Sequence, residues 1–548
     1  MKIIMIGSVA AGTSVAAKAR RNDENAQITL YNADNDISYS ICGIPYFLGG
    51  EVDKLESLTP RNAEWFKARY NVDIFTRHEV TKIHPDEKRI TVKNLHTNEI
   101  HEDTYDALVF ATGAFPITPM INGVDQQHVF HVRTIQNTAA IDAFMITNEP
   151  KKVTIIGAGL IGLEMTEQLT NKGLEVTLIQ RNHHIMTALD GDMAFRVEEH
   201  LKNKGVSLLC NEQVVSITEK TVETKSGKVI DTDMVILATG VRPNTKLAKE
   251  IGVEIGSTGA IKVNKKMQTN LPNIYAVGDV AESYSVITGQ PLYRPLGSTA
   301  NKMGRIAGDI ITGGDLEHRG ILGTGIVRVF DLAIAYTGLN EQEALDYGFN
   351  VEILHNIKPA RAEYLGGSEL VIKAICDRKT GRILGAQIIG KDGVDKRIDV
   401  FATAITFGAK AEDLFHLDLA YAPPFSTTKD PVMYTGMALE NAIKGKNKLI
   451  TPKELTERIE NKEKLQIIDT RAKKQYEVSN VAGAINIPLA QLRTEAKNLD
   501  PKVPTITYCN SGVTGNAAQN VLRNMGFKDV FNLSGGNKNY QIFLKSKK

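Results

Sequence analysis

The stretch Val153-Thr-Ile-Ile-Gly157-Ala-Gly159-Leu-Ile-Gly162 joins a short apolar run to a glycine-rich turn. A helical pattern follows the turn, and a second apolar run covers residues 176–180. This order predicts a strand, a helix and a parallel strand, with a pyrophosphate held by backbone N–H groups at the start of the helix. We therefore expect a dinucleotide-binding unit of the Rossmann type, built on these three glycines.

The same pattern occurs at the beginning of the chain. Residues 2–6 read as a buried strand, Gly7-Ser-Val-Ala-Ala-Gly12 as the turn, and residues 27–32 as the second strand. Val9 stands where the middle glycine is expected, so this fingerprint is incomplete. Two such units, with their turns 150 residues apart, indicate one site for a flavin and one for a nicotinamide.

Three further segments support two nucleotide sites. Residues 105–113 and 233–240 are near duplicates, each an apolar strand that ends in Ala-Thr-Gly, and residues 269–277 run into Gly278-Asp279. The sequence therefore predicts a flavoprotein that binds FAD and a nicotinamide. The candidate cofactor-binding residues are Gly7, Ala10, Gly12, Asn32, Ala111, Thr112, Gly113, Gly157, Gly159, Gly162, Gln180, Arg181, Gly240, Gly278 and Asp279.

The second strand of such a unit usually ends in an acid that binds the ribose hydroxyls. Here Asn32 and Gln180 occupy those places, and Arg181 follows. An asparagine still hydrogen-bonds a ribose, and the missing carboxylate at Gln180 no longer repels a 2′-phosphate. Both NADH and NADPH are therefore expected to be accepted. The alternative is that Arg181 is an ordinary solvated side chain.

Cys42 lies alone in Ser38-Tyr-Ser-Ile-Cys42-Gly-Ile-Pro-Tyr46, where a flavin enzyme that reduces disulfides usually has a C-x4-C pair. A single thiol must bond to something outside the chain, as a mixed disulfide, a persulfide or a sulfenic acid. The thiolate is the nucleophile, so we expect a lowered pKa at Cys42. Cys210 and Cys376 lie in apolar strand patterns and are expected to be core residues.

Composition excludes several classes of protein. The chain has 548 residues with 65 Lys and Arg against 63 Asp and Glu, a net charge of +2, so no nucleic-acid or membrane surface is expected. The apolar run after Met1 is too short for a signal peptide, and no membrane span or metal site is predicted. Four separated cysteines form no disulfide framework, which favours a cytoplasmic protein.

Residues 1–443 resemble the pyridine nucleotide-disulfide oxidoreductases, and within them the coenzyme A-disulfide reductases of the single-cysteine branch. The motifs that carry the resemblance are the two glycine turns, Ser38-x3-Cys42, Gly278-Asp279 and Tyr421-Ala-Pro-Pro-Phe-Ser. The resemblance implies an α/β fold with a discontinuous FAD-binding domain and an inserted NAD(P)-binding domain. An α+β domain then makes a homodimer. The implied bounds are 1–112 with 244–321, 113–243, and 322–443.

The resemblance also implies roles for single residues. Asp279 binds the ribityl chain of the flavin, and Cys42 is the redox thiol. Tyr364 and Tyr421 reach Cys42 from the partner subunit, where a phenol hydrogen-bonds a leaving thiolate or donates a proton. Coenzyme A contacts carry over to Ser14, Lys18, Arg21, Ser38, Asn301 and Lys429. As alternatives, Tyr421 packs on its two prolines, and the basic residues of the first helix are merely solvated.

The C-terminal region resembles rhodanese over residues 453–548, after a linker placed at 444–452. The carrying motifs are Ile467-Ile-Asp-Thr-Arg471, Val481-Ala-Gly-Ala-Ile-Asn-Ile-Pro488 and Leu533-Ser-Gly-Gly536. Cys509 begins the loop Cys509-Asn-Ser-Gly-Val-Thr-Gly515 at a helix N-terminus, and the resemblance implies that it carries a persulfide. Asn510 replaces the arginine common in sulfurtransferases, which argues against thiosulfate as the donor. The alternative is an inactive interaction module.

These features predict an NAD(P)H-dependent reductase of coenzyme A persulfides, polysulfides or disulfides, in which Cys509 passes sulfane sulfur through coenzyme A to Cys42. Two rivals remain. One is an NADH oxidase or peroxidase that cycles Cys42 through sulfenic acid. Those relatives place a histidine at the position of Ala10, which argues against this rival. The other is a sensor in which Cys509 reports sulfide stress.

Overall fold

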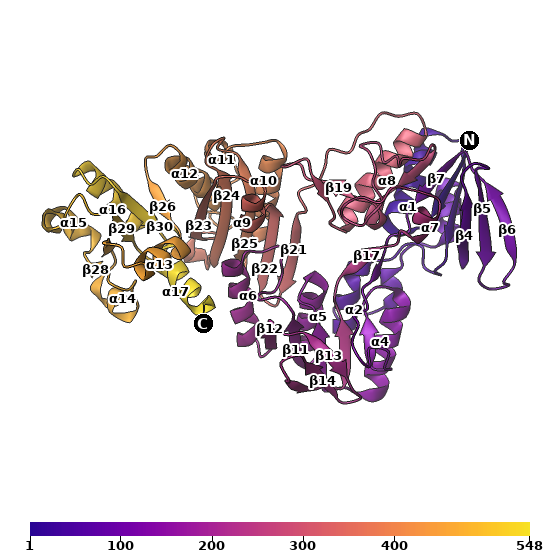
Figure 1. Cartoon of the computed structure of the whole chain (residues 1–548), viewed down its shortest axis with the longest axis horizontal. Helices are drawn as coiled ribbons and strands as arrows, with labels where there is room; N and C mark the ends of the chain where they lie inside the picture. The colour runs from indigo at the N-terminus through magenta and orange to yellow at the C-terminus, as the bar shows by residue number, and fades with distance from the viewer. Residues whose placement is uncertain (548) are drawn as a thin grey trace. The chain divides into compact units, whose positions relative to one another are not determined.

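The computed structural model describes residues 1–547, which fall into two compact units. The first unit contains residues 1–183 and 206–323. The second contains residues 184–205 and the chain from Thr324 onward. The chain therefore leaves the first unit for one short excursion before it returns, and then crosses for good (Figure 1).

The first sheet of the first unit is parallel and has its glycine turn at the end of its middle strand. Its order is β18 (Ile274–Ala276), β7 (Ala107–Phe110), β1 (Lys2–Ile6), β2 (Gln27–Asn32) and β3 (Asp73–Thr76). Helices α1 (Val9–Asn22) and α8 (Gly297–Ile311) pack closely at Gly304, which has no Cβ. A Cβ at this position would lie 2.5 Å from the Ala11 carbonyl oxygen. The apolar strands are buried, as both faces of a parallel sheet usually are.

The second sheet repeats this plan. Its order is β12 (Ser207–Cys210), β11 (Glu175–Gln180), β10 (Lys152–Ile156), β16 (Met234–Leu237) and β9 (Val129–His131), all parallel. Helix α5 (Leu160–Asn171) follows β10 directly, and α4 (Ile135–Asn148) follows β9. Two Rossmann-type units were expected from the glycine turns, and this expectation is confirmed.

Small antiparallel sheets complete the first unit. They are β4 (His78–His84), β5 (Arg89–Asn94) and β6 (Ile100–Thr104), and β13 (Val214–Ile217), β14 (Thr221–Thr224) and β15 (Val229–Asp231). β19 (Ser283–Tyr284) pairs with β20 (Pro291–Leu292), and this unit also contains the helices η2 (Leu55–Leu58), α3 (Ala63–Tyr70) and α7 (Lys246–Glu250).

The duplicated Ala-Thr-Gly segments lie where the chain passes between the two Rossmann-type units, and their threonines hydrogen-bond the neighbouring connecting segment. Strand β8 (Ala114–Pro116) pairs antiparallel with β17 (Val241–Pro243) immediately after them. The Thr112 hydroxyl donates to the Asn244 carbonyl oxygen at 2.8 Å, and the Thr239 hydroxyl donates to that of Ile117 at 2.6 Å. Each threonine thus bonds to the chain that crosses beside it, which explains why the motif occurs twice.

The second unit contains an antiparallel sheet and a parallel one. The antiparallel sheet has the order β21 (Gly325–Val329), β22 (Leu332–Gly338), β25 (Ile383–Gly390), β24 (Glu369–Asp377) and β23 (Val351–Pro359). Its helices are α9 (Glu341–Asp346), η4 (Glu363–Leu365), α10 (Val394–Thr406), α11 (Ala411–Phe415) and α12 (Pro431–Ile443). Helix α6 (Gly191–Asn203) joins this unit, although the sequence prediction places it in the NAD(P)-binding domain.

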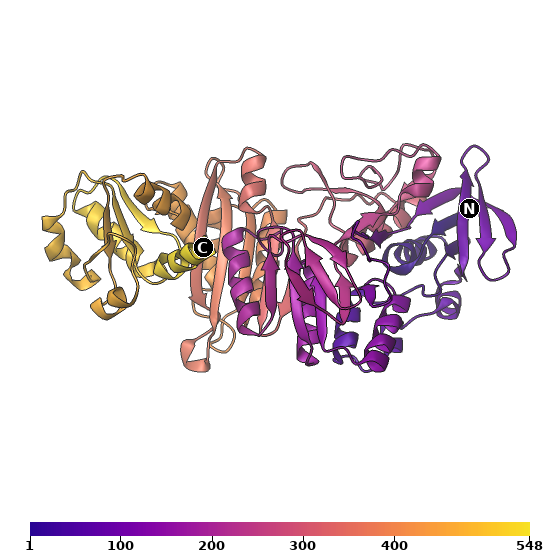
Figure 2. The same cartoon turned by 60° about the horizontal axis from the view of Figure 1, so that its bottom comes forward.

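The parallel sheet near the C-terminus has helices on both faces (Figures 1 and 2). Its order is β26 (Lys448–Ile450), β30 (Val530–Leu533), β29 (Thr505–Tyr508), β27 (Gln466–Asp469) and β28 (Ile485–Asn486). Ile467 packs toward α13 (Pro452–Glu460) and α17 (Gly536–Ser546), whereas Ile468 packs toward α15 (Leu489–Glu495) and α16 (Val513–Asn524). Successive residues of a strand point to opposite faces, so one strand serves two cores. The short α14 (Lys473–Val478) and η5 (Ala496–Asn498) complete this region.

Part of the segment 444–452 differs from its prediction as a linker. Residues 448–450 form β26, which pairs with β30 as the edge strand of the parallel sheet. Thr451 caps α13 by accepting from the Glu454 N–H, and Pro452 occupies the first helical turn. The charged Lys-Gly-Lys-Asn-Lys composition hid the strand, because an edge strand exposes lysines to solvent.

Among residues 1–547, no helix combines the length and the apolar character that a membrane span requires.

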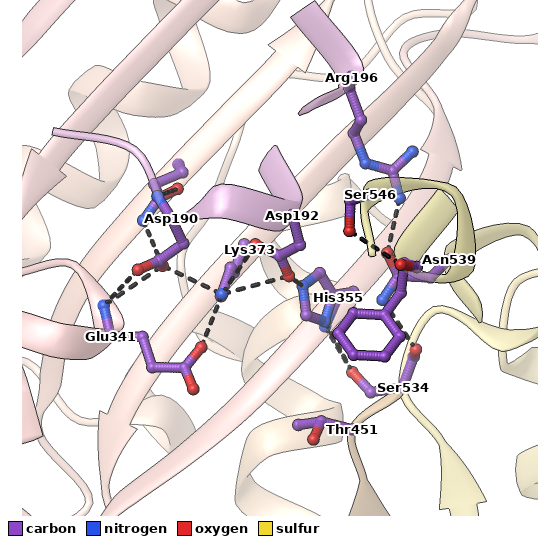
Figure 3. A network of polar contacts seen from close by, with 12 residues as sticks. Asp190, Asp192, Arg196, Glu341, His355, Lys373, Thr451, Ser534, Asn539 and Ser546 are labelled. Atoms are coloured by element: carbon purple, nitrogen blue, oxygen red, sulfur yellow. Dashed lines mark hydrogen bonds and ion pairs between the residues drawn. The ribbon is translucent and has the colours of Figure 1, made fainter. Parts of the chain in front are cut away.

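A buried lysine stands at the centre of the second unit (Figure 3). Lys373 of β24 is 1% exposed, and its Nζ lies 3.1 Å from Asp190, 3.0 Å from Asp192 and 2.7 Å from Glu341. Burial disfavours the charged ammonium, but the three carboxylates prevail and raise the pKa of Lys373. The ammonium therefore joins α6, β24 and α9 through one charge.

The same network reaches the C-terminal region through His355 of β23 (Figure 3). The His355 Nε2 lies 2.6 Å from Asp192, and its backbone N–H donates to the Ser534 hydroxyl at 2.7 Å. Arg196 of α6 donates to the Asn539 side-chain oxygen at 2.6 Å. These contacts fix the loop after β30 against the antiparallel sheet.

Replacing Lys373 with methionine should destabilise the second unit strongly. The substitution leaves three partly buried carboxylates without the buried cation that they share, a loss typically about 3–5 kcal/mol of unfolding free energy. Calorimetric unfolding of the full chain measures this loss as a lower transition temperature.

The matched control is Lys379→Met, because Lys379 is exposed in the turn that follows β24. It should unfold at the wild-type temperature. Equal unfolding of Lys373→Met and Lys379→Met would show that the network contributes no stability.

Candidate functional site

The first glycine turn is shaped for a close approach of the backbone to a ligand. Gly7 has φ 98°, and a Cβ there would lie 2.3 Å from the Ala111 carbonyl oxygen. A Cβ at Gly12 would lie 2.2 Å from the Gly7 oxygen. The Ser8 hydroxyl between them is buried and has no hydrogen-bond partner within the described residues. A buried hydroxyl needs a partner, and a phosphate oxygen of FAD at this turn would supply one.

Two residues near this turn refine the sequence prediction. Val9, at the place of the missing glycine, has φ 49°, a left-handed conformation that β-branched residues rarely adopt. Asn32 is buried, and its amide nitrogen donates to the Asp34 carbonyl oxygen at 2.9 Å. Its amide therefore shapes the following loop, and only its side-chain oxygen is left for a ribose. Ala10 lies in the first turn of α1 and presents only a methyl group.

The second glycine turn has the same geometry, with open space beside its middle glycine, Gly159. A Cβ at Gly157 would lie 2.3 Å from the Ala238 carbonyl oxygen, and one at Gly162 would lie 1.9 Å from the Gly157 oxygen. A Cβ at Gly159 meets no atom within 4 Å. Gln180 is buried at the end of β11, Arg181 is exposed beside it, and Gly240 has φ 94° after the second Ala-Thr-Gly. The turn therefore leaves space for a pyrophosphate above the start of α5.

Gly278 and Asp279 stand where β18 ends, in the short helix η3 (Gly278–Val280). A Cβ at Gly278 would lie 2.7 Å from that of Ala11, so the glycine lets this loop pack on α1. The Arg133 guanidinium donates to Asp279 at 3.1 Å. Arg133 carries no motif, and only the tertiary structure assigns it to this site. One carboxylate oxygen of Asp279 remains to accept from a ribityl hydroxyl.

Cys42 lies in the short helix η1 (Ile41–Gly43), just before α2 (Ile44–Gly49), and is exposed. Its pKa is raised, first because neighbouring atoms desolvate the thiol and second because of the Glu164 carboxylate. Arg133 acts in the opposite direction. The expectation of a lowered pKa is therefore not met by the surroundings that the chain provides. Glu164 lies on α5, and its carboxylate accepts from the Tyr46 hydroxyl at 3.2 Å.

A cationic cavity of about 470 Å³ opens beside α1. It is lined by Thr13, Ser14, Ala17, Lys18, Arg21, Arg61, Trp65, Phe66, Arg69, Tyr70, Asn301 and Arg305. Four residues that the resemblance connects with coenzyme A therefore share one cavity. Ser38 lies in the loop before Cys42 and is not part of this lining, and Lys429 belongs to the second unit.

Some cationic side chains of this cavity have a carboxylate partner in the described part of the chain and others have none. The Lys18 Nζ lies 2.9 Å from Asp309, and the hydrogen bond from Lys18 lowers the pKa of that carboxyl to about 2. The Arg61 guanidinium stacks over Trp65 at 5.0 Å, and Arg69 stacks over the same ring at 5.6 Å. Arg305 has no carboxylate partner within the described residues. The uncommitted guanidinium groups suit phosphates, and the indole ring suits a stacked base.

Sequence reasoning missed Arg61, Trp65, Arg69 and Arg305. The first three are spaced four residues apart; Trp65 and Arg69 lie on one side of α3, and Arg61 precedes this helix with its guanidinium over the Trp65 ring. The four-residue spacing could have indicated from the sequence that these side chains lie together. Arg305 was not visible, because it arrives on α8 from far along the chain.

Tyr364 and Tyr421 lie in neighbouring loops of the second unit. The Ala362 N–H donates to the Pro423 carbonyl oxygen at 3.4 Å, which holds the two loops together. Tyr364 is 79% exposed and Tyr421 is 50% exposed, as are the neighbouring Leu365 and Phe425 at 44% and 71%. Aromatic side chains exposed together in this way are typical of a surface that a partner covers.

Cys509 directly follows β29 and opens the turn into α16. The residue is 6% exposed, and the Gly512 N–H points at its sulfur from 3.2 Å. The helix N-terminus and this N–H stabilise negative charge on the sulfur. Of the other cysteines, Cys376 is buried, and burial raises the pKa of its thiol to about 12. Cys376 therefore stays protonated, as expected of a core residue, and Cys210 ends strand β12.

Three family models match this chain. Residues 1–300 match the pyridine nucleotide-disulphide oxidoreductase model, and residues 325–431 match the dimerisation domain of the same family. Residues 451–542 match the rhodanese-like domain.

Two curated relatives each match about four-fifths of the chain. A Pyrococcus furiosus protein named NAD(P)H sulfur oxidoreductase (CoA-dependent) is 39% identical over 448 residues, 80% of this chain and 99% of the relative. A Methanocaldococcus jannaschii protein named NADH oxidase is 38% identical over 449 residues, 81% of this chain and 99% of the relative.

Two solved structures match nearly the whole chain. The reduced Bacillus anthracis protein called CoADR-RHD has a TM-score of 0.97 and 39% identity, covering 99% of this chain and 98% of its own. An NAD-dependent persulfide reductase from A. fulgidus has a TM-score of 0.91 and 35% identity, covering 98% of this chain and 100% of its own.

Replacing Glu164 with glutamine should make Cys42 more reactive at neutral pH. The carboxylate disfavours the thiolate, so its removal lowers the pKa of the Cys42 thiol and moves alkylation by iodoacetamide to lower pH. Mass spectrometry of the peptide that contains Cys42 follows the rate at each pH.

Glu175→Gln is the control, because Glu175 is exposed at the start of β11. An unchanged pH profile in Glu164→Gln would show that the carboxylate does not act on the thiol.

Proposed function

Because this chain belongs to the pyridine nucleotide-disulphide oxidoreductase family and ends in a rhodanese-like domain, we propose that it reduces coenzyme A persulfides, polysulfides and disulfides with NAD(P)H. The cationic cavity beside α1 is the observation that carries this proposal. Guanidinium groups for phosphates and an indole for a base suit a coenzyme A nucleotide. Four free cysteines in the described chain are consistent with a cytoplasmic enzyme.

We propose that the first turn binds FAD and the second binds NADH or NADPH, in the domains that the sequence predicts. The fit of the first turn rests on the unpartnered Ser8 hydroxyl and on the space that a Cβ at Gly7 or Gly12 would fill. FAD bound there supplies the transfer of two electrons from the nicotinamide to sulfur. Arg133 holds Asp279 for the ribityl chain.

Cys42 performs the covalent step. Its thiolate attacks the outer sulfur of a coenzyme A persulfide, a Cys42–sulfur bond forms, and coenzyme A leaves with the electrons of the broken bond. Two electrons and two protons then release hydrogen sulfide and restore the Cys42 thiol. With coenzyme A disulfide, the same attack leaves a mixed disulfide on Cys42. Desolvation and the Glu164 carboxylate raise the pKa of the Cys42 thiol, and Arg133 acts in the opposite direction.

The dimerisation domain supports a homodimer in which Tyr364 and Tyr421 serve the partner's Cys42. Both phenols are exposed in loops held together by the Ala362–Pro423 hydrogen bond. A phenol at the leaving sulfur donates the proton that coenzyme A takes up.

The rhodanese-like domain favours persulfide over disulfide as the substrate. Cys509 collects sulfane sulfur and loads it onto coenzyme A, which carries it to Cys42. The covalent fusion raises the local concentration of the second site to about the millimolar range.

Anaerobic oxidation of NADH and NADPH tests this function directly. We expect turnover with coenzyme A persulfide, release of hydrogen sulfide and no turnover without a thiol substrate. Preference for coenzyme A disulfide would make the enzyme a thiol-pool reductase. Fast oxidation only after air is admitted would assign it to the oxidases, as the name of the Methanocaldococcus relative suggests.

The variants Cys42→Ser and Cys509→Ser distinguish the proposed roles of the two thiols. Cys42→Ser should lose all reduction, whereas Cys509→Ser should keep reduction of preformed coenzyme A persulfide and lose turnover from other sulfur donors. Equal losses in both variants would contradict the relay.

Replacing Arg305 with glutamine should weaken coenzyme A binding. The loss of one phosphate-binding guanidinium is expected to raise KM for coenzyme A persulfide about tenfold with little change in kcat, a typical cost for one charged hydrogen bond. Arg319→Gln is the control, because Arg319 is exposed and outside the cavity lining. An unchanged KM in Arg305→Gln would place the nucleotide elsewhere.

A further inference from the structure

The turn that begins with Cys509 lacks a cation of its own. Residues 509–515 contain no lysine or arginine. The nearby Arg471 is 6% exposed, and its guanidinium bonds to Asp469 at 2.7 Å and to the Asn510 side-chain oxygen at 3.1 Å. Arg471 is thus neutralised by a buried carboxylate and orients Asn510 instead of facing a substrate.

The Cys509 turn is bonded to the start of helix α17, which is joined by an ion pair to strand β24. The Asn537 N–H donates to the Cys509 carbonyl oxygen at 2.7 Å, and the Lys538 N–H donates to that of Asn510 at 3.1 Å. The Lys538 ammonium forms an ion pair with Glu369. Glu369 lies opposite Pro359 in the register of β24 and β23. The Cys509 turn therefore lies beside the Lys358–Pro359 end of β23.

Two lysines of the dimerisation domain gather at this end. The Lys358 Nζ lies 4.0 Å from the ring centre of Tyr434, and the Lys429 Nζ lies 5.8 Å from the same ring. Neither ammonium pairs with a carboxylate in the part of the chain that the structure describes. The pKa of Lys358 is lowered, first by burial; negative charge at Cys509 acts against this shift, and Lys429 adds to it. The Cys509 sulfur therefore lies within electrostatic range of Lys358.

We propose that Lys358, assisted by Lys429, is the specificity-determining cation of the Cys509 site and selects sulfane-sulfur donors with negative charge beside the transferred sulfur. This inference rests on the proposed role of Cys509 as a sulfur carrier. It reverses one sequence-based expectation, since Asn510 argued against thiosulfate. The charge that the loop lacks comes from another domain.

The chemistry with thiosulfate shows what the cation does. The Cys509 thiolate attacks the outer sulfur of thiosulfate, a Cys509–sulfur bond forms, and the sulfur–sulfur bond breaks. Sulfite leaves with the bonding electron pair, and Cys509 holds a persulfide. The donor is a dianion and the leaving group is a dianion, so an ammonium beside the turn stabilises both. No external oxidant or reductant is needed.

Sulfur transfer from thiosulfate to cyanide in the full-length dimer tests the proposal. Lys358→Gln should lower kcat/KM for thiosulfate about tenfold, the effect expected when one unit charge that acts on a partly desolvated site is removed. Lys358→Arg should restore most of it, because the charge returns. Lys528→Gln should match the wild type, because Lys528 is exposed before β30, at the amino-terminal end of the parallel strands, whereas the Cys509 turn lies at their carboxyl-terminal end.

Alkylation of Cys509 gives a second readout that does not depend on turnover. Iodoacetate is an anion and iodoacetamide is neutral, so their rate ratio at the Cys509 peptide reports local positive charge. The ratio should fall about fivefold or more in Lys358→Gln and stay at the wild-type value in Lys528→Gln.

The outcomes separate this inference from the proposed function. An unchanged ratio together with an unchanged kcat/KM in Lys358→Gln would overturn the role of Lys358, and so would a wild-type protein that forms no thiocyanate. Sulfur transfer to cyanide uses no nicotinamide. A protein that forms thiocyanate but does not oxidise NADH with coenzyme A persulfide would therefore contradict only the function of Cys42.

Discussion

A charged lysine inside the second unit is tolerated only because three carboxylates surround it. Lys373 lies on β24, whereas its partners come from the start of α6 and from α9. The cost of burying an ammonium is repaid only when all of these partners are present, so the network forms as a whole or not at all. His355 extends it from Asp192 to Ser534, beside the loop that contacts the Cys509 turn. The position of a reactive sulfur thus depends on a charge cluster that touches no substrate.

The surroundings of Cys42 and Cys509 differ in how they act on negative charge at the sulfur. The sulfur of Cys509 faces an N–H group at a helix N-terminus and lies within electrostatic range of Lys358. Cys42 is desolvated and lies near Glu164, so its thiolate is disfavoured by the protein that surrounds it. This difference fits the proposed roles. A sulfur carrier must react with free donors, whereas a redox thiol gains from being unreactive until its substrate and its electrons are both present.

Charged side chains from one domain act on groups in another domain at two places in the second unit. Residues 509–515 contain no lysine or arginine, and the cation proposed for this turn, Lys358, belongs to the dimerisation domain, where it lies with Lys429 over the Tyr434 ring. The short excursion of residues 184–205 into the second unit provides Asp190, Asp192 and Arg196. In both cases a charge needed by one domain is supplied by another, because a polar group buried at a domain boundary must find its partner across it.

The sequence by itself determined the two Rossmann-type units, the dimerisation domain, the rhodanese-like module and the single thiol Cys42. Glycine turns, Ala-Thr-Gly repeats and the Cys509 loop are local patterns, and the backbone geometry that they require is written into consecutive residues. Tertiary structure alone decided the rest. Arg133, Glu164, Arg305 and Lys358 carry no motif, because each acts on a group far away in the chain. Strand β26 was read as a linker for a related reason, since its apolar partner β30 lies some 80 residues later. Long-range electrostatics and edge pairing depend on distances in space, and no local pattern encodes those distances.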